Sequence, residues 1–215
     1  MVGQRQENTI IKTHLKDQYA MDKQTIDAYN QEAENIAQLH ATLTPHRIYE
    51  LINHYFIKEG ASIDIGCGIG RDTHWLTQQG FPATGVDASQ QMLKQAQVLY
   101  PDGNFFQDEL PDLKQLTEAR FQNILCSAVL MHLNPFDLDT ACHRLLQLLD
   151  DPGCLIISFR DTHESSNREK GKLYQTIHIE NFLKIFQDKQ CKILVQESET
   201  EALRNLTWHN FVIKK

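Results

Sequence analysis

The sequence predicts an α/β domain whose mostly parallel sheet is covered by helices on both faces. Segments typical of strands and helices alternate through the middle of the chain, and a glycine-rich stretch follows the first of these strands. The chain has 215 residues, 41% of them hydrophobic and 23% charged, which fits one globular core and argues against a disordered chain or a membrane protein.

The N-terminal part divides into a polar extension and two helices. Residues 1–24 show no sustained apolar periodicity, whereas apolar positions recur at helical spacing from Thr25 onward. A second short helix is expected over 46–56, after Pro45. We therefore expect one domain over 25–215, in which the helices of 25–57 cap the site.

The middle of the chain alternates between the two kinds of element. The short apolar run from Ala61 to Ile65 is bounded by glycine on both sides and predicts a buried strand. A serine cap is expected at Ser89 and a turn at 151–153. Strands are expected over 61–65, 83–87, 104–108, 121–128 and 154–159, and helices over 71–79, 89–99 and 136–149. Such alternation predicts parallel strands joined by crossover helices.

The last third departs from this alternation. A helix is expected around 179–186, and it is followed by strands over 192–197 and 208–213 with no helix between them. Two strands joined only by the short polar segment 198–207 predict an antiparallel pair at the edge of the sheet.

Charge and cysteine content exclude several classes of protein. With 21 basic and 28 acidic residues the net charge is −7, and the longest basic run is Lys214-Lys215, which argues against a nucleic-acid binder. The five cysteines are odd in number and form no C-x-x-C pair, which predicts free thiols and no metal site. No apolar run is long enough for a membrane helix or a signal peptide, so a cytoplasmic location is expected.

The glycine-rich stretch is the strongest functional signal. Six of the ten glycines fall between Gly60 and Gly85, and three of them form the turn Gly66-Cys67-Gly68-Ile69-Gly70. A glycine turn between a strand and a helix presents backbone N–H groups to a ligand that can lie against the backbone. Glycines also serve tight turns without any ligand, but the preceding strand and the following helix favour a nucleotide site.

Two acidic residues narrow the choice of nucleotide. The spacing is G-x-G-x-G rather than the dinucleotide pattern G-x-G-x-x-G, and Asp64 precedes the turn, which suits a ligand with an amino or sulfonium group better than a pyrophosphate. Asp87 ends the next strand at about the interval where an acidic residue accepts hydrogen bonds from ribose hydroxyls. A helix-capping role for Asp87 is the alternative and is compatible with ribose binding.

Four motifs in the same order resemble the class I S-adenosylmethionine-dependent methyltransferases. They are Asp64 to Asp72, Gly85 to Ser89, Asp108, and Ser127 to Leu133. The resemblance covers about 25–215 and is strongest to a small bacterial subgroup, on Gly70-Arg71-Asp72, Ser158-Phe159-Arg160 and Arg204 with Trp208 and Asn210.

The resemblance implies a Rossmann-like α/β/α sandwich with a seven-stranded sheet in the order 3-2-1-4-5-7-6, strand 7 antiparallel. It also implies S-adenosylmethionine as cofactor and S-adenosylhomocysteine as product. Asp64 and the backbone of Gly66, Gly68 and Gly70 would hold the methionine part, and Asp87 the ribose. Cys67 would pack within the turn. The adenine and the sulfur would be contacted by Ala88, Met92, Asp108, Glu109, Leu110 and Ser127.

Residues for catalysis and acceptor binding are less defined by the sequence. The cofactor activates the methyl group, so the protein mainly positions the reactants, and a base is needed only if the acceptor must lose a proton. His132, after the fourth strand, is the candidate base, with structural packing as the alternative. Four further residues are candidates to bind or cover the acceptor, namely Tyr29, Arg160, Arg204 and Trp208. Arg168 is a further candidate to bind an anionic acceptor.

Three functions remain open at this stage. The first is transfer of a methyl group by in-line displacement to a small-molecule acceptor, with a loop over 161–176 as a mobile cover. The second is a protein that binds the cofactor as a sensor or scaffold, and the third is a nicotinamide-dependent oxidoreductase. DNA is not expected as a partner, because an Asn-Pro-Pro-aromatic sequence is absent after the fourth strand. We expect a monomer or a weak homodimer.

Overall fold

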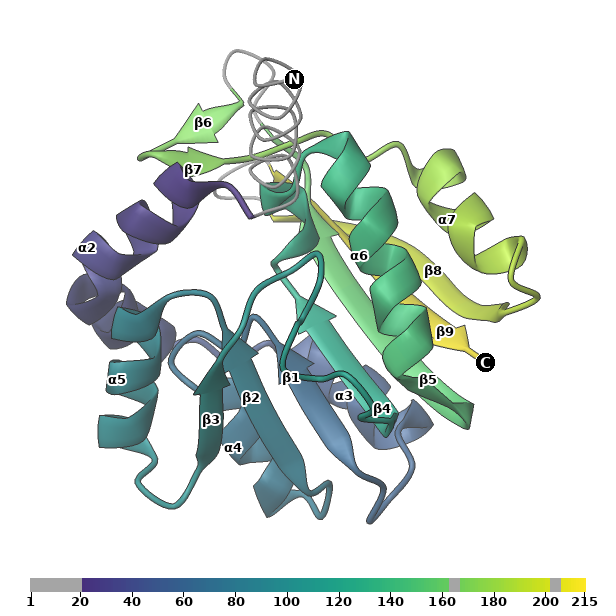
Figure 1. Cartoon of the computed structure of the whole chain (residues 1–215), viewed down its shortest axis with the longest axis horizontal. Coiled ribbons are helices and arrows are strands. Elements are labelled where there is room, and N and C mark those ends of the chain that lie inside the picture. Colours follow the sequence, from purple (N-terminus) through teal and green to yellow (C-terminus); the bar gives the residue numbers. More distant parts are fainter. Residues whose placement is uncertain (1–20, 163–166, 202–205) are drawn as a thin grey trace, which may run out of the picture.

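The centre of the molecule is a twisted seven-stranded sheet (Figure 1). The computed structural model describes residues 21–162, 167–201 and 206–215. The strand order is β3-β2-β1-β4-β5-β9-β8. The strands are β1 (Ser62–Ile65), β2 (Ala83–Asp87), β3 (Asn104–Gln107), β4 (Phe121–Ser127), β5 (Leu149–Arg160), β8 (Lys192–Glu201) and β9 (Leu206–Lys214).

The five strands from β3 to β5 are parallel, as the alternation of strands and helices predicts. β1 is buried along its whole length, and its residue Asp64 pairs with Gly85 of β2 and with Leu125 of β4. The carboxyl ends of β1, β2 and β4 therefore lie together at one edge of the sheet, which is where α/β proteins place their ligands.

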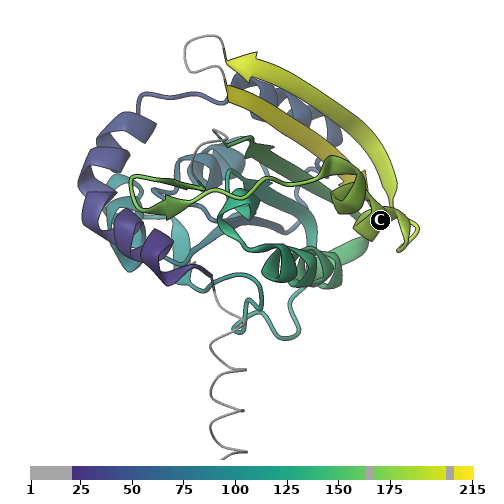
Figure 2. The ribbon, with the colours of Figure 1, turned by 90° about the horizontal axis from the view of Figure 1, so that it is seen from above.

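Helices cover both faces of the sheet (Figures 1 and 2). One apolar cluster joins α3 and α4 to one face, and a larger one joins α6 and α7 to the other. Between β3 and β4 the chain forms a loop instead of a helix, and buried Leu113 and Leu116 pack onto the α6 side. The helices are α2 (Lys23–His40), α3 (His46–Tyr55), α4 (Arg71–Gln78), α5 (Gln90–Leu99), η1 (Leu130–His132, a 3₁₀ turn), α6 (Pro135–Leu148) and α7 (Ile179–Gln187).

The edge formed by β8 and β9 confirms the expected break in the alternation. β9 runs antiparallel to β5, with Ser158 opposite Asn210, and β8 runs antiparallel to β9. The strand order agrees with the order 3-2-1-4-5-7-6 implied by the resemblance, because β9 and β8 take the places of strands 7 and 6.

A small hairpin was not anticipated from the sequence. Its strands β6 (Arg168–Glu169) and β7 (Lys172–Leu173) lie within the segment expected to be only a loop, and β7 packs against α2 (Figure 2). Strands of two residues carry no readable periodicity, and the turn is made by Lys170 and Gly171 with φ of 48° and 81°. Together α2 and the hairpin form what we call the roof of the site.

In the described part of the chain, no helix is long and apolar enough to cross a membrane.

Candidate active site

The glycine turn joins the end of β1 to the start of α4. Gly66, Gly68 and Gly70 all have positive φ, at 75°, 55° and 76°. A Cβ on Gly66 would lie 2.2 Å from Cγ2 of Val129, so packing against the end of β4 requires this glycine. A Cβ on Gly68 would meet no atom of the chain nearer than the methyl of Met92 at 3.4 Å. A side chain at Gly68 would thus touch Met92 but would not clash with the chain.

Asp87 at the end of β2 is bonded to that turn. Its carboxylate accepts hydrogen bonds from the N–H of Gly68 at 2.8 Å and from the N–H of Ser89 at 2.7 Å. Burial raises its pKa. A carboxylate has about four lone-pair positions, so two remain for hydroxyl groups of a ligand. The expected capping function therefore falls to Ser89, whose hydroxyl accepts from the N–H of Met92.

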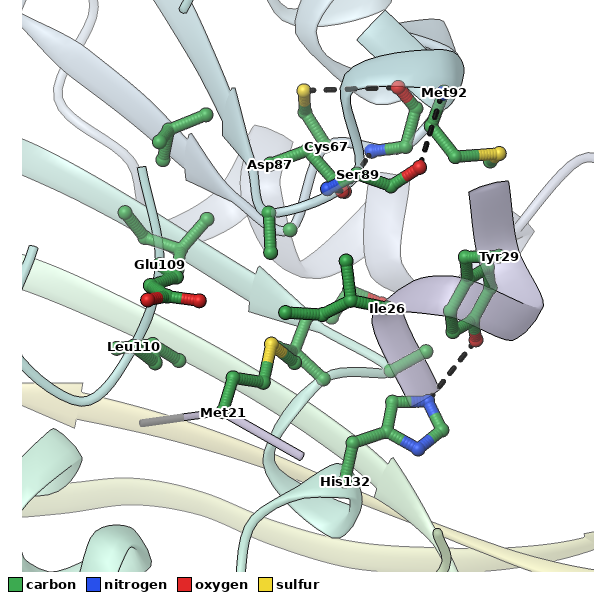
Figure 3. Close-up of a pocket in the computed structure, with 18 of the residues that line it drawn as sticks. Met21, Ile26, Tyr29, Cys67, Asp87, Ser89, Met92, Glu109, Leu110 and His132 are labelled. Carbon is green, nitrogen blue, oxygen red and sulfur yellow. Dashed lines mark hydrogen bonds between the residues drawn. The ribbon is translucent and has the colours of Figure 1, made fainter. Parts of the chain in front are cut away.

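One cavity lies over the turn, beneath α2 (Figure 3). Its walls come from the carboxyl ends of β1, β2 and β4, from the segment after β3, and from α2. Most of the residues predicted to bind the cofactor or the acceptor line it, namely Tyr29, Gly66, Cys67, Gly68, Asp87, Ala88, Met92, Asp108, Glu109, Leu110, Ser127 and His132.

Asp64 lies next to the turn but does not line the cavity. Its carboxyl group is 3% exposed and accepts a hydrogen bond from the Thr73 hydroxyl of α4 at 2.7 Å. Burial raises the pKa of Asp64 to about 7. Asp64 therefore holds α4 against β1 from beneath the turn. Gly70, which precedes the first residue of α4, is also absent from the cavity wall.

Asp108 shapes the segment that follows β3. Its carboxylate accepts from the backbone N–H groups of Glu109, Lys114 and Gln115 at 2.9, 3.1 and 2.8 Å. These three bonds fold 109–115 into a compact loop, which places Leu110 and Glu109 in the cavity wall. Partial burial raises the pKa of the Glu109 carboxyl.

His132 and Tyr29 meet at the end of the cavity away from Asp87 (Figure 3). Nε2 of His132 lies 3.0 Å from the hydroxyl oxygen of Tyr29, and Nδ1 lies 2.5 Å from the carbonyl oxygen of Leu173. Burial lowers the pKa of His132 to about 4, so the ring is neutral near pH 7. A base of this strength removes protons poorly at neutral pH, and its free nitrogen already faces the Tyr29 hydroxyl.

The candidate anion clamps do not line the cavity. Arg160 is 6% exposed, donates to the Glu169 carboxylate at 2.6 Å, and stacks over the Tyr174 ring at 3.8 Å. Arg168 pairs with Asp22 of the roof. Trp208 lies on β9, opposite Arg160, outside the cavity wall. Arg204 lies outside the described residues.

Several lining residues were not singled out from the sequence. Ile26 belongs to the apolar periodicity that predicted the first helix, and Arg71 and Asp72 were noted only as part of the turn motif. The arrangement of α2 over the cavity was the missing information, since it depends on contacts with the distant hairpin. The lining residues for which no role in binding was predicted are Met21, Thr25, Ile26, His40, Ile65, Ile69, Arg71, Asp72, Val86, Ser89, Leu113, Ala128 and Val129.

The charges of the wall favour a cationic ligand. Among the described residues, the lining includes Asp87, Asp108 and Glu109, and Arg71 is its only lysine or arginine. The Arg71 guanidinium is bonded through Nε and Nη2 to both oxygens of Asp72 at 2.8 Å. A pyrophosphate would thus find little positive charge, whereas a sulfonium nucleoside fits both the charge and the unobstructed position at Gly68. Fold and cavity together define an α/β domain for a positively charged nucleoside cofactor.

Comparison with known proteins supports this assignment. Residues 63–153 match the family described as a methyltransferase domain. An uncharacterized methyltransferase of Alkaliphilus oremlandii is 28% identical over 164 residues, which cover 74% of this chain and 71% of that protein. One of Synechocystis sp. is 30% identical over 105 residues, covering 49% of this chain and 48% of that protein.

A solved structure shares the fold. The 1,6-didemethyltoxoflavin-N1-methyltransferase of Burkholderia thailandensis, solved with 1,6-didemethyltoxoflavin and S-adenosylhomocysteine, superposes with a TM-score of 0.70 at 19% identity, over 88% of this chain and 86% of that one. The chain is therefore similar to S-adenosylmethionine-dependent methyltransferases, over residues 63–153 by the family match and over most of its length by the fold. The match and the fold support a methyltransferase activity that uses S-adenosylmethionine.

Proposed function

We propose that the cavity beneath α2 binds S-adenosylmethionine on the glycine turn and transfers its methyl group to a small molecule held between α2 and η1. One observation carries this proposal. Asp87, the unobstructed side-chain position at Gly68 and the segment 127–129 at the end of β4 border the same cavity, under a roof built from α2. Cofactor and acceptor would thus share one enclosed space.

Each cofactor-binding residue has a specific proposed function. The free lone pairs of Asp87 would accept from the ribose hydroxyls, while its bond to the N–H of Gly68 keeps the turn in place. Ala88, Met92 and Leu110 would enclose the adenine, and the loop held by Asp108 would contact its polar edge. Asp64 would act from below the turn by fixing α4 through Thr73.

The bound cofactor supplies an already activated methyl group on a sulfonium. The chain's own residues have to position the acceptor, exclude water and leave a path for the proton that the acceptor loses. Tyr29 and Ile26 of α2, and Met21 just before this helix, line the cavity and would cover it. The small-molecule acceptor bound in the Burkholderia structure supports an acceptor of similar class here. Buried, unpaired cysteines support a cytoplasmic location.

Calorimetric titration with S-adenosylhomocysteine, S-adenosylmethionine and NAD tests the proposal. We expect both sulfur nucleosides to bind, with S-adenosylhomocysteine at 100 times its Kd adding about 2.7 kcal/mol of stability, and NAD to have no effect. Asp87→Asn should weaken binding at least tenfold, because the ribose would lose a charged acceptor. Asp102→Asn, which changes an exposed acid outside the cavity, is the matched control.

The outcomes separate the alternatives. Binding of NAD alone would reject the proposal and favour an oxidoreductase. Tight binding of S-adenosylmethionine without methyl transfer to any member of a metabolite collection would favour a sensor. If Asp87→Asn and Asp102→Asn change the affinity for the sulfur nucleosides equally, the cavity is not the cofactor site.

A further inference from the structure

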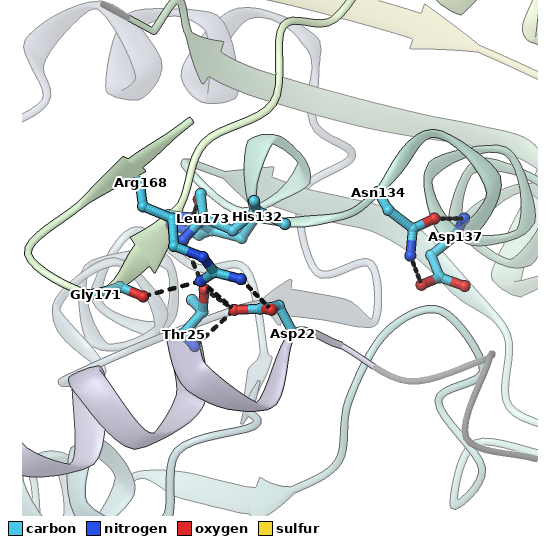
Figure 4. Close-up of polar contacts among 8 residues, drawn as sticks. All are labelled: Asp22, Thr25, His132, Asn134, Asp137, Arg168, Gly171 and Leu173. Atoms are coloured by element: carbon cyan, nitrogen blue, oxygen red, sulfur yellow. Dashed lines mark hydrogen bonds and ion pairs between the residues drawn. The ribbon is translucent and has the colours of Figure 1, made fainter. Parts of the chain in front are cut away.

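A continuous series of hydrogen bonds crosses the roof from the hairpin to α2 (Figure 4). The Arg168 guanidinium donates to both oxygens of Asp22 at 2.9 and 2.8 Å. The Thr25 hydroxyl donates to Oδ1 of Asp22 at 2.7 Å and accepts from the N–H of Leu173 at 2.8 Å. Since a backbone N–H can only donate, the single hydrogen of the Thr25 hydroxyl must point to Asp22.

The direction of the next bonds follows from the same reasoning. The carbonyl oxygen of Leu173 can only accept, so the hydrogen of the neutral His132 ring must be on Nδ1. Nε2 then carries a lone pair and can only accept, so the bond between it and the Tyr29 oxygen uses the Tyr29 hydrogen. His132 is 2% exposed, so water does not compete for these positions.

The consequence for Tyr29 is a fixed polarity. Its one hydroxyl hydrogen is directed to His132, and its oxygen therefore offers only lone pairs to a molecule in the cavity, which Tyr29 lines. Among the described residues that line the cavity, none near Tyr29 gives a free charged donor, since Met21, Ile26 and Ala128 are apolar and the Arg71 guanidinium is bonded to Asp72. Lys172 lies 4.7 Å from the centre of the Tyr29 ring, but it is paired with Glu32 and is outside the cavity lining.

We infer that Tyr29 selects the methyl acceptor, and that it selects a molecule whose reacting atom carries a hydrogen, an amine or a hydroxyl, over a carboxylate or another oxyanion. The inference rests on the proposed function, because it assigns this end of the cavity to the acceptor. A donor group on the acceptor satisfies the Tyr29 oxygen, whereas an oxyanion would place lone pairs against lone pairs. Loss of the donor should therefore weaken binding about tenfold or more.

The tautomer of His132 can be measured without any substrate. Nitrogen-15 spectra of histidine-labelled protein, with the resonance assigned through His132→Gln, should show hydrogen on Nδ1 and a lone pair on Nε2 from pH 8 down to pH 5. In Tyr29→Phe the Nε2 resonance should shift and the Nδ1 resonance should stay. Hydrogen on Nε2 in the native protein would reverse the polarity of Tyr29 and overturn the inference.

Matched probes test the selection itself. In protein saturated with S-adenosylhomocysteine, benzimidazole, which carries an N–H, should bind about tenfold tighter than 1-methylbenzimidazole and tighter than benzoate, as followed at the His132 resonance. Tyr29→Phe should abolish the difference between the two benzimidazoles and leave the Kd of S-adenosylhomocysteine unchanged. Tyr55→Phe, a hydroxyl deletion on α3 outside the cavity, should behave as the native protein.

Four results would overturn the inference: equal binding of the two benzimidazoles to the native protein, tighter binding of benzoate, binding of neither benzimidazole, or weaker S-adenosylhomocysteine binding in Tyr29→Phe. The last result would assign Tyr29 to the cofactor instead. Failure of S-adenosylhomocysteine to bind the native protein would reject the proposed function separately, because the tautomer measurement needs no cofactor. Thermal unfolding of Tyr29→Phe and Tyr55→Phe confirms that both variants fold.

Discussion

Arg168 donates hydrogen bonds to both carboxylate oxygens of Asp22, 146 positions earlier in the chain, and so joins the β6–β7 hairpin to the first turn of α2. The pair holds the pKa of Asp22 at about 2, well below its usual range. Lys172 adds a second link, with its ammonium 2.7 Å from the Glu32 carboxylate. Both pairs join the hairpin to α2, which borders the cavity.

Replacing Arg168 should accelerate ligand exchange. In Arg168→Met we expect S-adenosylhomocysteine to dissociate about fivefold faster, because an ion pair of this partial exposure contributes up to about 1 kcal/mol. Stopped-flow displacement by excess S-adenosylmethionine measures the rate. Lys184→Met is the matched control, since it removes an exposed ion pair with Asp188 on α7. Equal dissociation rates in the two variants would show that the roof does not limit exchange.

The sequence was sufficient to predict the sheet and the turn, because both depend on local patterns. β2 was predicted with the bounds that the structure shows, and most other elements within about two residues, since alternation and capping act over a few positions. β5 and β8 are exceptions. β5 begins at Leu149, the last residue of the predicted helix, and runs through the predicted turn at 151–153, and β8 continues to Glu201.

Partnerships across the chain were not predictable. The sequence shows Arg160 at a strand end but gives no indication of its partner Glu169. Tyr29 was predicted as an acceptor candidate, but nothing local places it beside His132.

Gly68 offers a test that separates cofactor binding from stability. Gly68 and Gly80 both have positive φ, and at neither would a Cβ meet a close atom of the chain. Gly68→Ala and Gly80→Ala should thus cost a similar 1–2 kcal/mol or so for the left-handed backbone. Only Gly68→Ala places a methyl group in the cavity, and we expect it to weaken S-adenosylhomocysteine binding at least tenfold by calorimetry, while Gly80→Ala binds normally. Normal binding by both variants would place the cofactor away from the turn.

Asp64 should make the free protein less stable as the pH rises. Its pKa is about 7 in the folded protein and about 3.9 in an unfolded chain, so the folded state holds a proton that the unfolded state has released. Stability from this group is complete below about pH 4 and is lost as the pH rises to about 7. Urea unfolding at pH 5 and pH 8 should therefore show the stability of Asp64→Asn increasing relative to the native protein. The stability of Asp102→Asn, a change at an exposed position, should not vary with pH relative to the native protein. If the relative stability of Asp64→Asn does not vary either, Asp64 is ionised in the folded protein.

His132 should have the opposite effect at acidic pH. Its folded pKa is lowered to about 4, whereas an unfolded histidine titrates near 6.5, so below pH 6.5 the unfolded chain binds a proton that the folded protein excludes. The stabilising contribution is complete above pH 6.5 and declines as the pH falls toward 4, by up to about 3 kcal/mol. The native protein should therefore lose stability relative to His132→Gln between pH 6.5 and pH 4.5 in urea titrations, while His143→Gln, on the partly exposed face of α6, follows the native curve. If the native protein and His132→Gln instead keep a constant difference across this range, His132 takes up a proton in the folded protein as readily as in the unfolded chain, and the neutral ring expected down to pH 5 is wrong.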